Sequence, residues 1–302
     1  MTRTTDYAYI ETTNYCNLNC SFCNRPDVIG ELNHMPIFKF RQVLDKIGPD
    51  IKEAKLMGMG EPFLHPHFST ICKIFKEKYP NAFLISSTNA QYSAKAKVAE
   101  SLKYIDMLYV SIDGFEDSYE KYRPPAKWPK LIKFLEELST LERYSCKVAF
   151  NYTVNPGNVD DIQKVYELLK HYNFDELRLN LVQSWDEDAS IQDSIGSFSI
   201  EQLEYLKANW SPMIKGKKDW DFSDCFWVQR GVYVTTEGNI KVCCMNTGAK
   251  TIKNIFAIKS INDAFSSEQY QEIKNGCESK TPSSHCKTCS YKELTGLLQK
   301  VI

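Results

Sequence analysis

The feature that most constrains the fold is an alternation of short apolar runs with amphipathic stretches between residue 7 and about residue 215. The short runs predict strands, and the amphipathic stretches have the apolar spacing of helices. The expected strands are 7–12, 54–59, 82–86, 107–112, 147–154 and 176–182, and the expected helices lie near 38–47, 68–78, 93–102, 128–140 and 159–171. This order favours a parallel sheet with crossover helices. A partial barrel, a full barrel and an open doubly wound sheet all fit the periodicity.

The pattern changes after about residue 216. Two short β-like runs, 230–235 and 239–242, flank Thr236-Glu237-Gly238, which predicts a hairpin with the glycine at its turn. A single helix over 261–274 and a cysteine-rich tail follow. Residues 183–198 are predicted to form a loop, and a helix near 200–208 would bridge the two parts. We therefore expect an α/β protein with two domains, residues 1–215 and 216–302.

Charge and hydropathy exclude several classes of function. The chain has 37 Lys and Arg against 38 Asp and Glu, a net charge of −1, so no global basic field attracts nucleic acid. No apolar run approaches the roughly 18 residues that span a bilayer, and the first residues lack the apolar segment of a signal peptide. We expect a soluble cytoplasmic protein that binds neither nucleic acid nor membranes. In that reducing compartment, its 11 cysteines favour metal or redox chemistry over disulfides.

Three cysteines, Cys16, Cys20 and Cys23, lie within eight residues directly after the first expected strand. Thiolates at this spacing suit a soft metal or an iron–sulfur cluster. Three ligands are one short of the four that a [4Fe–4S] cluster takes, so one iron would be open to a small ligand. A zinc site or a chance grouping is the alternative interpretation of this spacing alone.

The chain here resembles the radical S-adenosylmethionine (SAM) enzymes, whose signature is this cysteine spacing with an aromatic residue, here Phe22, before the last cysteine. The resemblance covers residues from about 7 to 215. Four further segments that follow expected strands resemble family motifs: Gly60-Glu61-Pro62, Ser87-Thr88-Asn89-Ala90, Ser111-Ile112-Asp113-Gly114 and Tyr122-Arg123. Met59, Ala90 and Pro124 stand where the family motifs have glycine.

The resemblance implies a partial (β/α)6 barrel with SAM bound at the carboxyl ends of its strands. It implies that Gly60 and Glu61 hold the amino group of SAM and that Arg123 pairs with its carboxylate. Ser111 and Asp113 would contact the ribose, and Phe22 and Asn89 belong to the same SAM-binding set. The charges agree, because a carboxylate suits an ammonium and a guanidinium suits a carboxylate. Each residue taken alone also fits an ordinary turn or surface role.

A second group of cysteines, Cys225, Cys243, Cys286 and Cys289, lies in the C-terminal part. Four thiolates so spaced enclose either a zinc ion or a fully ligated [4Fe–4S] cluster. The group resembles the twitch subdomain, a short form of the SPASM extension, which implies one auxiliary [4Fe–4S] cluster. The chain ends 13 residues after Cys289 without the further cysteines of a full SPASM domain. Cys277 competes for a ligand place.

Cys244 directly follows Cys243, and strand alternation places the two side chains on opposite faces. One of the pair is therefore expected to be free of the cluster. We expect Cys243 to be the ligand, and a free Cys244 would be a candidate to donate a hydrogen atom, as the resemblance to radical epimerases implies. A packed thiol and an alternate ligand are the other roles open to Cys244.

The resemblance implies an enzyme that takes an electron from an external donor, such as flavodoxin or ferredoxin, and cleaves SAM to a 5′-deoxyadenosyl radical. The leading hypothesis is oxidation or epimerisation of a small polyhydroxylated substrate, a sugar or an aminocyclitol. It rests on the single-cluster tail and on the cysteine motif beginning at residue 16, which leaves no room for an N-terminal leader-binding domain. The alternatives are modification of a ribosomally synthesised peptide and a zinc-stapled or iron–sulfur redox or binding protein.

Overall fold

The computed structural model describes residues 5–25, 29–182, 198–244, 251–282, 286 and 289–302. The predicted loop at 183–198 therefore lies almost entirely outside the described residues. The first six strands are β1 (Tyr7–Ile10), β2 (Glu53–Leu56), β3 (Phe83–Thr88), β4 (Met107–Ser111), β5 (Lys147–Val154) and β6 (Glu176–Leu181). All neighbouring pairs among them are parallel.

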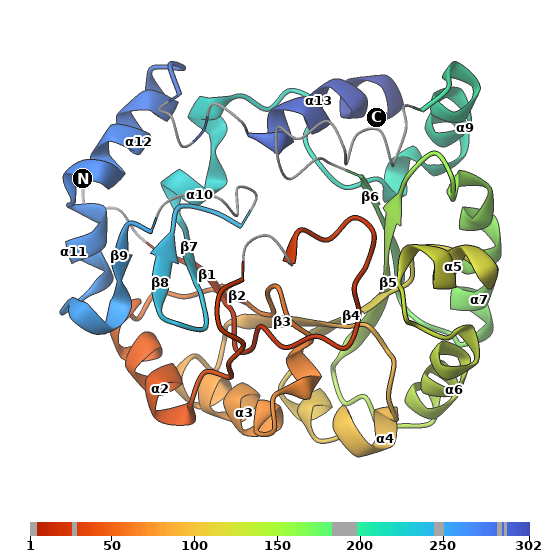
Figure 1. Ribbon diagram of the computed structural model, residues 1–302, viewed down its shortest axis with the longest axis horizontal. Helices are drawn as coiled ribbons and strands as arrows, with labels where there is room; N and C mark the ends of the chain where they lie inside the picture. The colour runs from red at the N-terminus through yellow and green to blue at the C-terminus, as the bar shows by residue number, and fades with distance from the viewer. Residues whose placement is uncertain (1–4, 26–28, 183–197, 245–250, 283–285, 287–288) are drawn as a thin grey trace.

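The six strands stand in the sheet in the same order as in the chain. A doubly wound sheet reverses direction at its centre, whereas this order winds continuously in one direction, as in a barrel. Helices form a ring outside the strands in Figure 1. The structure thus confirms the partial (β/α)6 barrel and excludes the open doubly wound sheet.

The connecting helices bury their apolar stripes against the outer face of this sheet. They are α2 (Ile37–Lys46), α3 (Phe68–Lys78), α4 (Ala94–Lys97), α5 (Asp117–Tyr122), α6 (Trp128–Ser139) and α7 (Ile162–His171). Short 3₁₀ turns η1 (Pro62–Leu64), η2 (Ser101–Lys103) and η3 (Val159–Asp161) lie between them. In β6, Leu177, Leu179 and Leu181 are buried in this outer core, whereas Arg178 and Asn180 on the inner face are only half-buried. The concave face of β6 is therefore polar and partly exposed, whereas Ile85, Met107, Tyr109 and Ala149 form a small apolar cluster on the inner face of β3, β4 and β5.

The C-terminal part extends the same sheet. It contains α9 (Ile200–Trp210), η4 (Ser211–Met213), η5 (Phe222–Asp224), α10 (Phe226–Gln229), β7 (Gly231–Val234), β8 (Asn239–Lys241), β9 (Lys253–Asn254), η6 (Ile255–Ala257), α11 (Ile261–Phe265), α12 (Glu268–Glu278) and α13 (Ser290–Val301). Strand β7 pairs in parallel with β1, and β8 and β9 follow antiparallel. Helix α13 packs on α9 and β6 at the other end of the sheet. The predicted domain boundary at residues 215 and 216 stays a prediction.

Two expected helices are divided in the structure, and two further helices were missed. The predicted single helix over 261–274 is wrong, because the chain breaks at Ser266 and Ser267 into α11 and α12, and the Ser267 hydroxyl accepts from the amide of Tyr270 to cap α12. The predicted helix near 93–102 is divided into α4 and η2. Helices α5 and α13 were missed.

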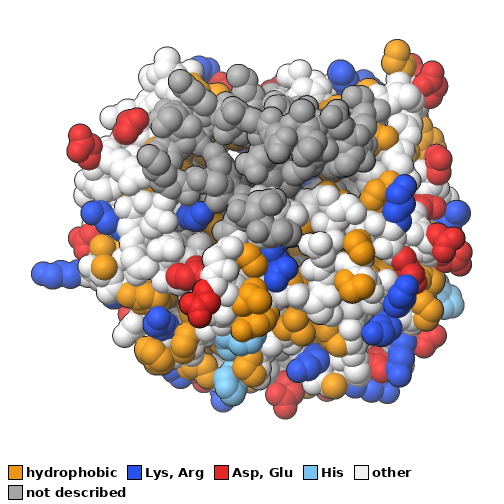
Figure 2. Space-filling model, viewed as in Figure 1, with side chains coloured by type: hydrophobic (Ala, Val, Ile, Leu, Met, Phe, Trp, Pro, Cys, Tyr) orange, Lys and Arg blue, Asp and Glu red, His pale blue; other side chains and the backbone are white. Residues whose placement is uncertain are grey.

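The hairpin at Gly238 is confirmed. Its φ of 84° lies in the left-handed region that favours glycine, and a Cβ atom there would lie 2.3 Å from the ring of Phe256. Acidic and basic side chains are interspersed on the face shown in Figure 2. Among the described residues, no helix has both the length and the apolar character to cross a membrane.

Candidate functional site: two cysteine centres on one barrel

The first centre is the loop that follows β1, which lies over the mouth of the barrel (Figure 1). It carries Cys16, Cys20 and Cys23, which are all half-buried. Burial raises the pKa of Cys16, and it raises that of Cys20 to about 12. The charge of Cys23 acts on both of these thiols in the same direction. The structure thus brings the three predicted ligands into one electrostatic group.

The end of α5 and the turn after β3 hold this loop in place. The amide of Asn19 donates to the carbonyl of Pro124 over 2.6 Å, and the amide of Ser21 donates to the carbonyl of Tyr122 over 3.0 Å. The side chain of Asn89 reaches the loop as well, donating to Asn17 Oδ1 over 2.7 Å. The motifs after β3 and β4 therefore support the cysteine loop directly.

Gly60 allows the closest of these approaches. A Cβ atom at this position would lie 2.3 Å from the carbonyl oxygen of Thr13 and 2.6 Å from that of Tyr15. The next amide, that of Glu61, donates to the Tyr15 carbonyl over 2.7 Å. The turn after β2 and the start of the cysteine loop are thus packed backbone against backbone, which only glycine permits.

Glu61 is a buried carboxylate at the mouth, 3% exposed. Its oxygens accept from the amide of Asn89 and the hydroxyl of Tyr92, both over 2.6 Å. Burial raises its pKa to about 7. Among the described residues it has hydrogen-bond donors but no ion-pair partner, and a cationic group bound there would favour its ionised form. Tyr92 was not predicted, because a lone tyrosine after the third strand has no distinctive spacing.

The backbone at Ala90 shows how the chain accommodates a departure from the family motif. The residue stands where the family motif has glycine, and its φ of 59° is in the left-handed region. An alanine tolerates this conformation at a cost of roughly 1 kcal/mol. The hydroxyl of Thr88 accepts from the amide of Ala90 and stabilises the turn that presents Asn89.

Asp113 and Arg123 lie together in a buried ion pair. The other oxygen of Asp113 accepts from the amide of Thr153 over 2.6 Å. Arg123 Nε is buried without a hydrogen-bond partner, so the guanidinium retains a donor for an external carboxylate. The direct pairing of these two residues was not predicted. Both charges are close to the cysteine loop, since Arg123 and Asp113 both act on the pKa of Cys20.

The two remaining predicted residues lie at the same mouth. Ser111 ends β4 beside Asn151 of β5 and is half-buried on the concave face. Phe22 is half-buried in the turn between Cys20 and Cys23. Their roles toward SAM stay predictions.

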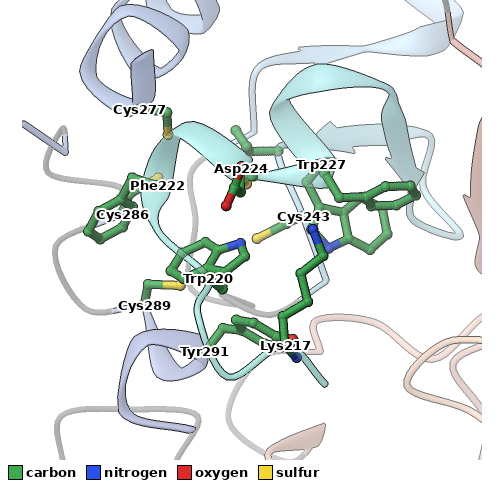
Figure 3. A pocket seen from close by; sticks show the side chains of 13 residues that line it. Lys217, Trp220, Phe222, Asp224, Trp227, Cys243, Cys277, Cys286, Cys289 and Tyr291 are labelled. Carbon is green, nitrogen blue, oxygen red and sulfur yellow. Dashed lines mark hydrogen bonds between the residues drawn. The ribbon is translucent and has the colours of Figure 1, made fainter. Parts of the chain in front are cut away.

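The second centre is a cavity of about 370 Å³ beside β7 and β8. Its lining includes all four predicted ligands, Cys225, Cys243, Cys286 and Cys289, and a fifth cysteine, Cys277. Figure 3 shows Cys277 approaching from a helix and the aromatic rings of Trp220, Phe222 and Tyr291 around the thiols. A thiol-rich, ring-walled space of this kind suits an iron–sulfur cluster.

Cys277 contacts two of the predicted ligands of this cavity, which its position in the sequence did not indicate. Its side chain is hydrogen-bonded to both Cys225 and Cys286, and the bond to Cys277 is the largest cause that raises the pKa of Cys225. The thiol is buried on α12, 2% exposed. Five described thiols therefore surround a space for which four ligands were predicted.

Cys243 and Cys244 face different spaces. Cys243 lines the cavity, whereas Cys244 is not part of its lining. Cys244 instead acts electrostatically on Lys55, Tyr9 and Tyr233, whose strands form one side of the barrel interior. Burial raises the pKa of Cys244 to about 11. The predicted division between these neighbouring thiols agrees with this arrangement.

Comparison with protein families decides the membership of the chain. The model of the radical SAM superfamily matches residues 10–169, which is more than half of the sequence. The chain belongs to the radical SAM superfamily. A second model, an iron–sulfur cluster-binding domain named SPASM, matches residues 225–290 and contains the cysteine cavity.

Curated relatives of this radical SAM protein have varied activities. The tRNA 4-demethylwyosine synthase TYW1 of Xenopus laevis is 26% identical over 158 residues, which are 48% of this chain and 21% of that protein. The tungsten-containing aldehyde ferredoxin oxidoreductase cofactor-modifying protein of Pyrococcus furiosus is 27% identical over 44% of this chain and 40% of its own length. The matches thus span less than half of these relatives. A GTP 3′,8-cyclase of Listeria monocytogenes is 23% identical over 68% of this chain and 67% of its own length.

Solved structures show the same fold over nearly the whole chain. BtrN in complex with AdoMet and 2-DOIA has a TM-score of 0.60 at 14% identity, covering 96% of this chain and 94% of BtrN. SuiB of Streptococcus suis bound to S-adenosylmethionine has a TM-score of 0.70 at 15% identity, covering 99% of this chain and 72% of SuiB. At these identities the likeness concerns the fold alone.

The cofactors of this radical SAM protein follow from its two domains: SAM and a [4Fe–4S] cluster in the first, and an auxiliary iron–sulfur cluster in the second. The residues present fit these groups. Among the described residues, the mouth has three grouped thiols, a buried carboxylate that forms no ion pair and a guanidinium with an unused donor. The second cavity supplies five thiols.

Proposed function

We propose that the protein abstracts a hydrogen atom from a small polyhydroxylated substrate, a sugar or an aminocyclitol, and oxidises or epimerises it. The observation that carries this proposal is the division between two adjacent thiols. Cys243 lines the cluster cavity, whereas Cys244 lies beside Lys55 and Tyr9 of the barrel interior. A thiol on the substrate side of the barrel is placed to return a hydrogen atom to a substrate.

The polar barrel interior supports a hydroxyl-rich substrate. Asn180 donates to Asn151 across neighbouring strands over 2.9 Å, and both side chains are half-buried on the concave face. Tyr9, Tyr109 and Ser111 lie on the same face. Amides and hydroxyls that both donate and accept are suited to bind sugar hydroxyl groups.

This chain's own residues bind and orient the reactants. SAM and the reduced N-terminal cluster, when bound, supply the 5′-deoxyadenosyl radical. In the proposed site Glu61 pairs with the ammonium of SAM, Arg123 donates to its carboxylate, and Ser111 and Asp113 contact the ribose. The loop that carries Cys16, Cys20 and Cys23 lies over the barrel mouth (Figure 1) and would place the N-terminal cluster beside the interior.

The two outcomes differ in their electron and proton balance. Abstraction breaks one C–H bond of the substrate and forms one C–H bond of 5′-deoxyadenosine. In oxidation the substrate radical then loses one electron, to an acceptor of the iron–sulfur class, and one proton. In epimerisation the S–H bond of Cys244 breaks to form the new C–H bond, and the sulfur radical then regains one electron from the external reductant, a flavodoxin or ferredoxin, and one proton from solvent.

The structural relatives include both substrate classes. BtrN is a radical SAM dehydrogenase whose structure holds 2-DOIA, and one structure of SuiB holds its precursor peptide SuiA. Peptide modification is therefore the second outcome that the substrate test below distinguishes.

The first experiment measures loading and SAM cleavage. Anaerobically reconstituted protein is expected to contain about eight irons and about eight sulfides and to release 5′-deoxyadenosine with dithionite and SAM. Cys16→Ala is expected to lose about half of the iron and the release of 5′-deoxyadenosine. Cys146→Ala, which removes a buried thiol outside both centres, is the matched control. About four irons with one zinc would indicate a zinc-stapled tail, and fully loaded protein that releases no 5′-deoxyadenosine would contradict the proposal.

The second experiment identifies the outcome. Sugars, aminocyclitols and short peptides are incubated with the loaded enzyme in D2O, and the products are analysed by mass spectrometry. Epimerisation through Cys244 places one deuterium in the product and is lost in Cys244→Ala, whereas oxidation lowers the product mass by two hydrogens and adds no deuterium. Turnover of peptides alone would refute the small-molecule substrate.

A further inference from the structure

Two cations of the barrel interior have no role in the proposed chemistry. In β2, Ala54 and Leu56 are fully buried in the outer core, so Lys55 points to the concave face. In β6 the same alternation places Arg178 on that face between Leu177 and Leu179. The guanidinium of Arg178 lies 4.8 Å from the ring centre of Tyr109, a member of the interior apolar cluster.

The two cations are near enough to interact electrostatically across the interior. Besides burial, the nearby charge of Arg178 acts to lower the pKa of Lys55, while Cys244 and Glu53 act to raise it. Like charges on opposite sides of one space repel unless an anion lies between them. The effect of Arg178 on Lys55, together with the alternation that turns both side chains to the concave face, places the two cations in one interior.

The carboxylates of the interior leave donors of these cations unused. Among the described residues Lys55 has a cation–π contact with Tyr7, at 5.9 Å, but no hydrogen bond or ion pair. Arg178 Nε is buried without a hydrogen-bond partner. Glu176 is 3.4 Å from Arg178 and is held more closely by Lys215, at 2.8 Å.

The positions of these charged residues along the barrel axis determine which of them a ligand contacts first. Glu53 and Glu176 are the first residues of β2 and β6, at the floor of the barrel. Lys55 and Arg178 lie two residues further along, which is about 7 Å closer to the mouth. Of the remaining charges, Glu11 and Lys241 line a separate polar pocket near the mouth, where they act on one another. A ligand that enters from the mouth reaches the two cations before the carboxylates of the floor.

We infer that Lys55 and Arg178 bind an oxyanion of the substrate, a carboxylate or a phosphate. A guanidinium and an ammonium with free donors on one accessible face form charge-assisted hydrogen bonds to such a group. The inference rests on the proposed function and narrows its substrate to an acidic polyhydroxylated molecule, such as a sugar acid or a sugar phosphate. The anion would anchor the substrate beside Cys244, which acts on Lys55.

The test measures anion binding to the reconstituted holoprotein with saturating SAM, so that the SAM site is filled. Inorganic phosphate, D-glucuronate and neutral D-glucose are titrated by calorimetry under anaerobic conditions at constant ionic strength. We expect saturable binding of at least one oxyanion, weakened at least tenfold in Lys55→Met and in Arg178→Met. Lys130→Met removes an exposed lysine from α6 and is the matched control, with unchanged affinity.

The separate titrations distinguish a phosphoryl group from a carboxylate. Binding of phosphate alone identifies a phosphoryl group, and binding of D-glucuronate alone identifies a carboxylate. No saturable oxyanion binding, or equal affinity in wild type and both variants, which would mark an adventitious ion, overturns the inference. Circular dichroism confirms that each variant is folded. Release of 5′-deoxyadenosine is measured separately, so failure of SAM cleavage and failure of anion binding are told apart.

Discussion

At the scale of single residues, the site depends on charges that are buried before any ligand arrives. Glu61 is held by the amide of Asn89 and the hydroxyl of Tyr92, and no cation among the described residues pairs with it. Arg123 is paired with Asp113 but retains an unused Nε donor. One carboxylate and one guanidinium are thus fixed in place at the mouth, where we propose that they bind the zwitterionic end of SAM.

Glu61→Gln tests the role of this carboxylate. Because charged hydrogen bonds contribute about 1.5–3 kcal/mol, SAM affinity is expected to fall at least tenfold while iron content is unchanged. Burial raises the pKa of Glu61 to about 7 in the ligand-free protein, and only the ionised form attracts the ammonium. SAM affinity of the wild type is therefore expected to decrease as pH falls through 7, and that of the variant is expected to stay flat. Equilibrium binding of SAM is measured, and Glu167→Gln, which changes an exposed carboxylate of α7, is the control. If both variants bound SAM with equal affinity, Glu61 would not contact the ammonium group.

The sequence predicted which residues lie at the mouth better than it predicted the contacts between them. Motif spacing located Glu61 and Asp113, because each follows a strand whose end lies at the mouth, and it located Arg123 at the end of α5. It missed that Asp113 and Arg123 pair with one another, and it missed Tyr92. These contacts depend on how loops fold over strand ends, which local periodicity does not encode.

At the scale of elements, boundaries were predictable where apolar spacing was strong. Strand β5 and helix α3 begin and end at the predicted residues, since their alternation and helical spacing continue without interruption. The α11–α12 break was missed because its apolar residues keep a nearly helical spacing across the two serines, and Ser267 acts as an N-cap instead. Local capping thus decided a boundary that hydropathy left open.

Gly60→Ala tests whether the turn after β2 holds the cysteine loop. The added methyl group would lie 2.3 Å from the Thr13 carbonyl, so the loop must shift. We expect a loss of about 1–3 kcal/mol in the free energy of unfolding and reduced loading of the N-terminal cluster. Gly30→Ala is the control, because its methyl group would meet no atom within 4 Å. Equal iron content and equal denaturation midpoints for the two variants would show that the loop adapts without cost.

At the scale of the whole molecule, the two cysteine centres belong to one continuous sheet. Strand β7 pairs with β1 over four residues, and Arg230 holds Asp6 through two hydrogen bonds of 2.6 and 2.7 Å. The sequence predicted two domains because its composition changes near residue 216, and the pairing of segments 224 residues apart leaves no mark on either segment. The second cavity is thereby fixed relative to the barrel interior. Cys243 lines the cavity, and the neighbouring Cys244 faces the barrel interior.

Leu298→Ala tests this continuity from the other end of the chain. Leu298 is fully buried on α13, which packs on α9 and β6, and its side chain lies against Gly216. Truncating a buried leucine lowers the free energy of unfolding by about 2–5 kcal/mol. Because α13 covers β6, we expect the barrel strand β6 to be destabilised as well. Hydrogen exchange of the holoprotein should therefore become faster in peptides of β6 and α9 as well as in α13, whereas Lys300→Ala, an exposed change on the same helix, should leave all three unchanged. Faster exchange confined to α13 would mean that the C-terminal segment unfolds alone, and that residues 216–302 form a separate unit despite the shared sheet.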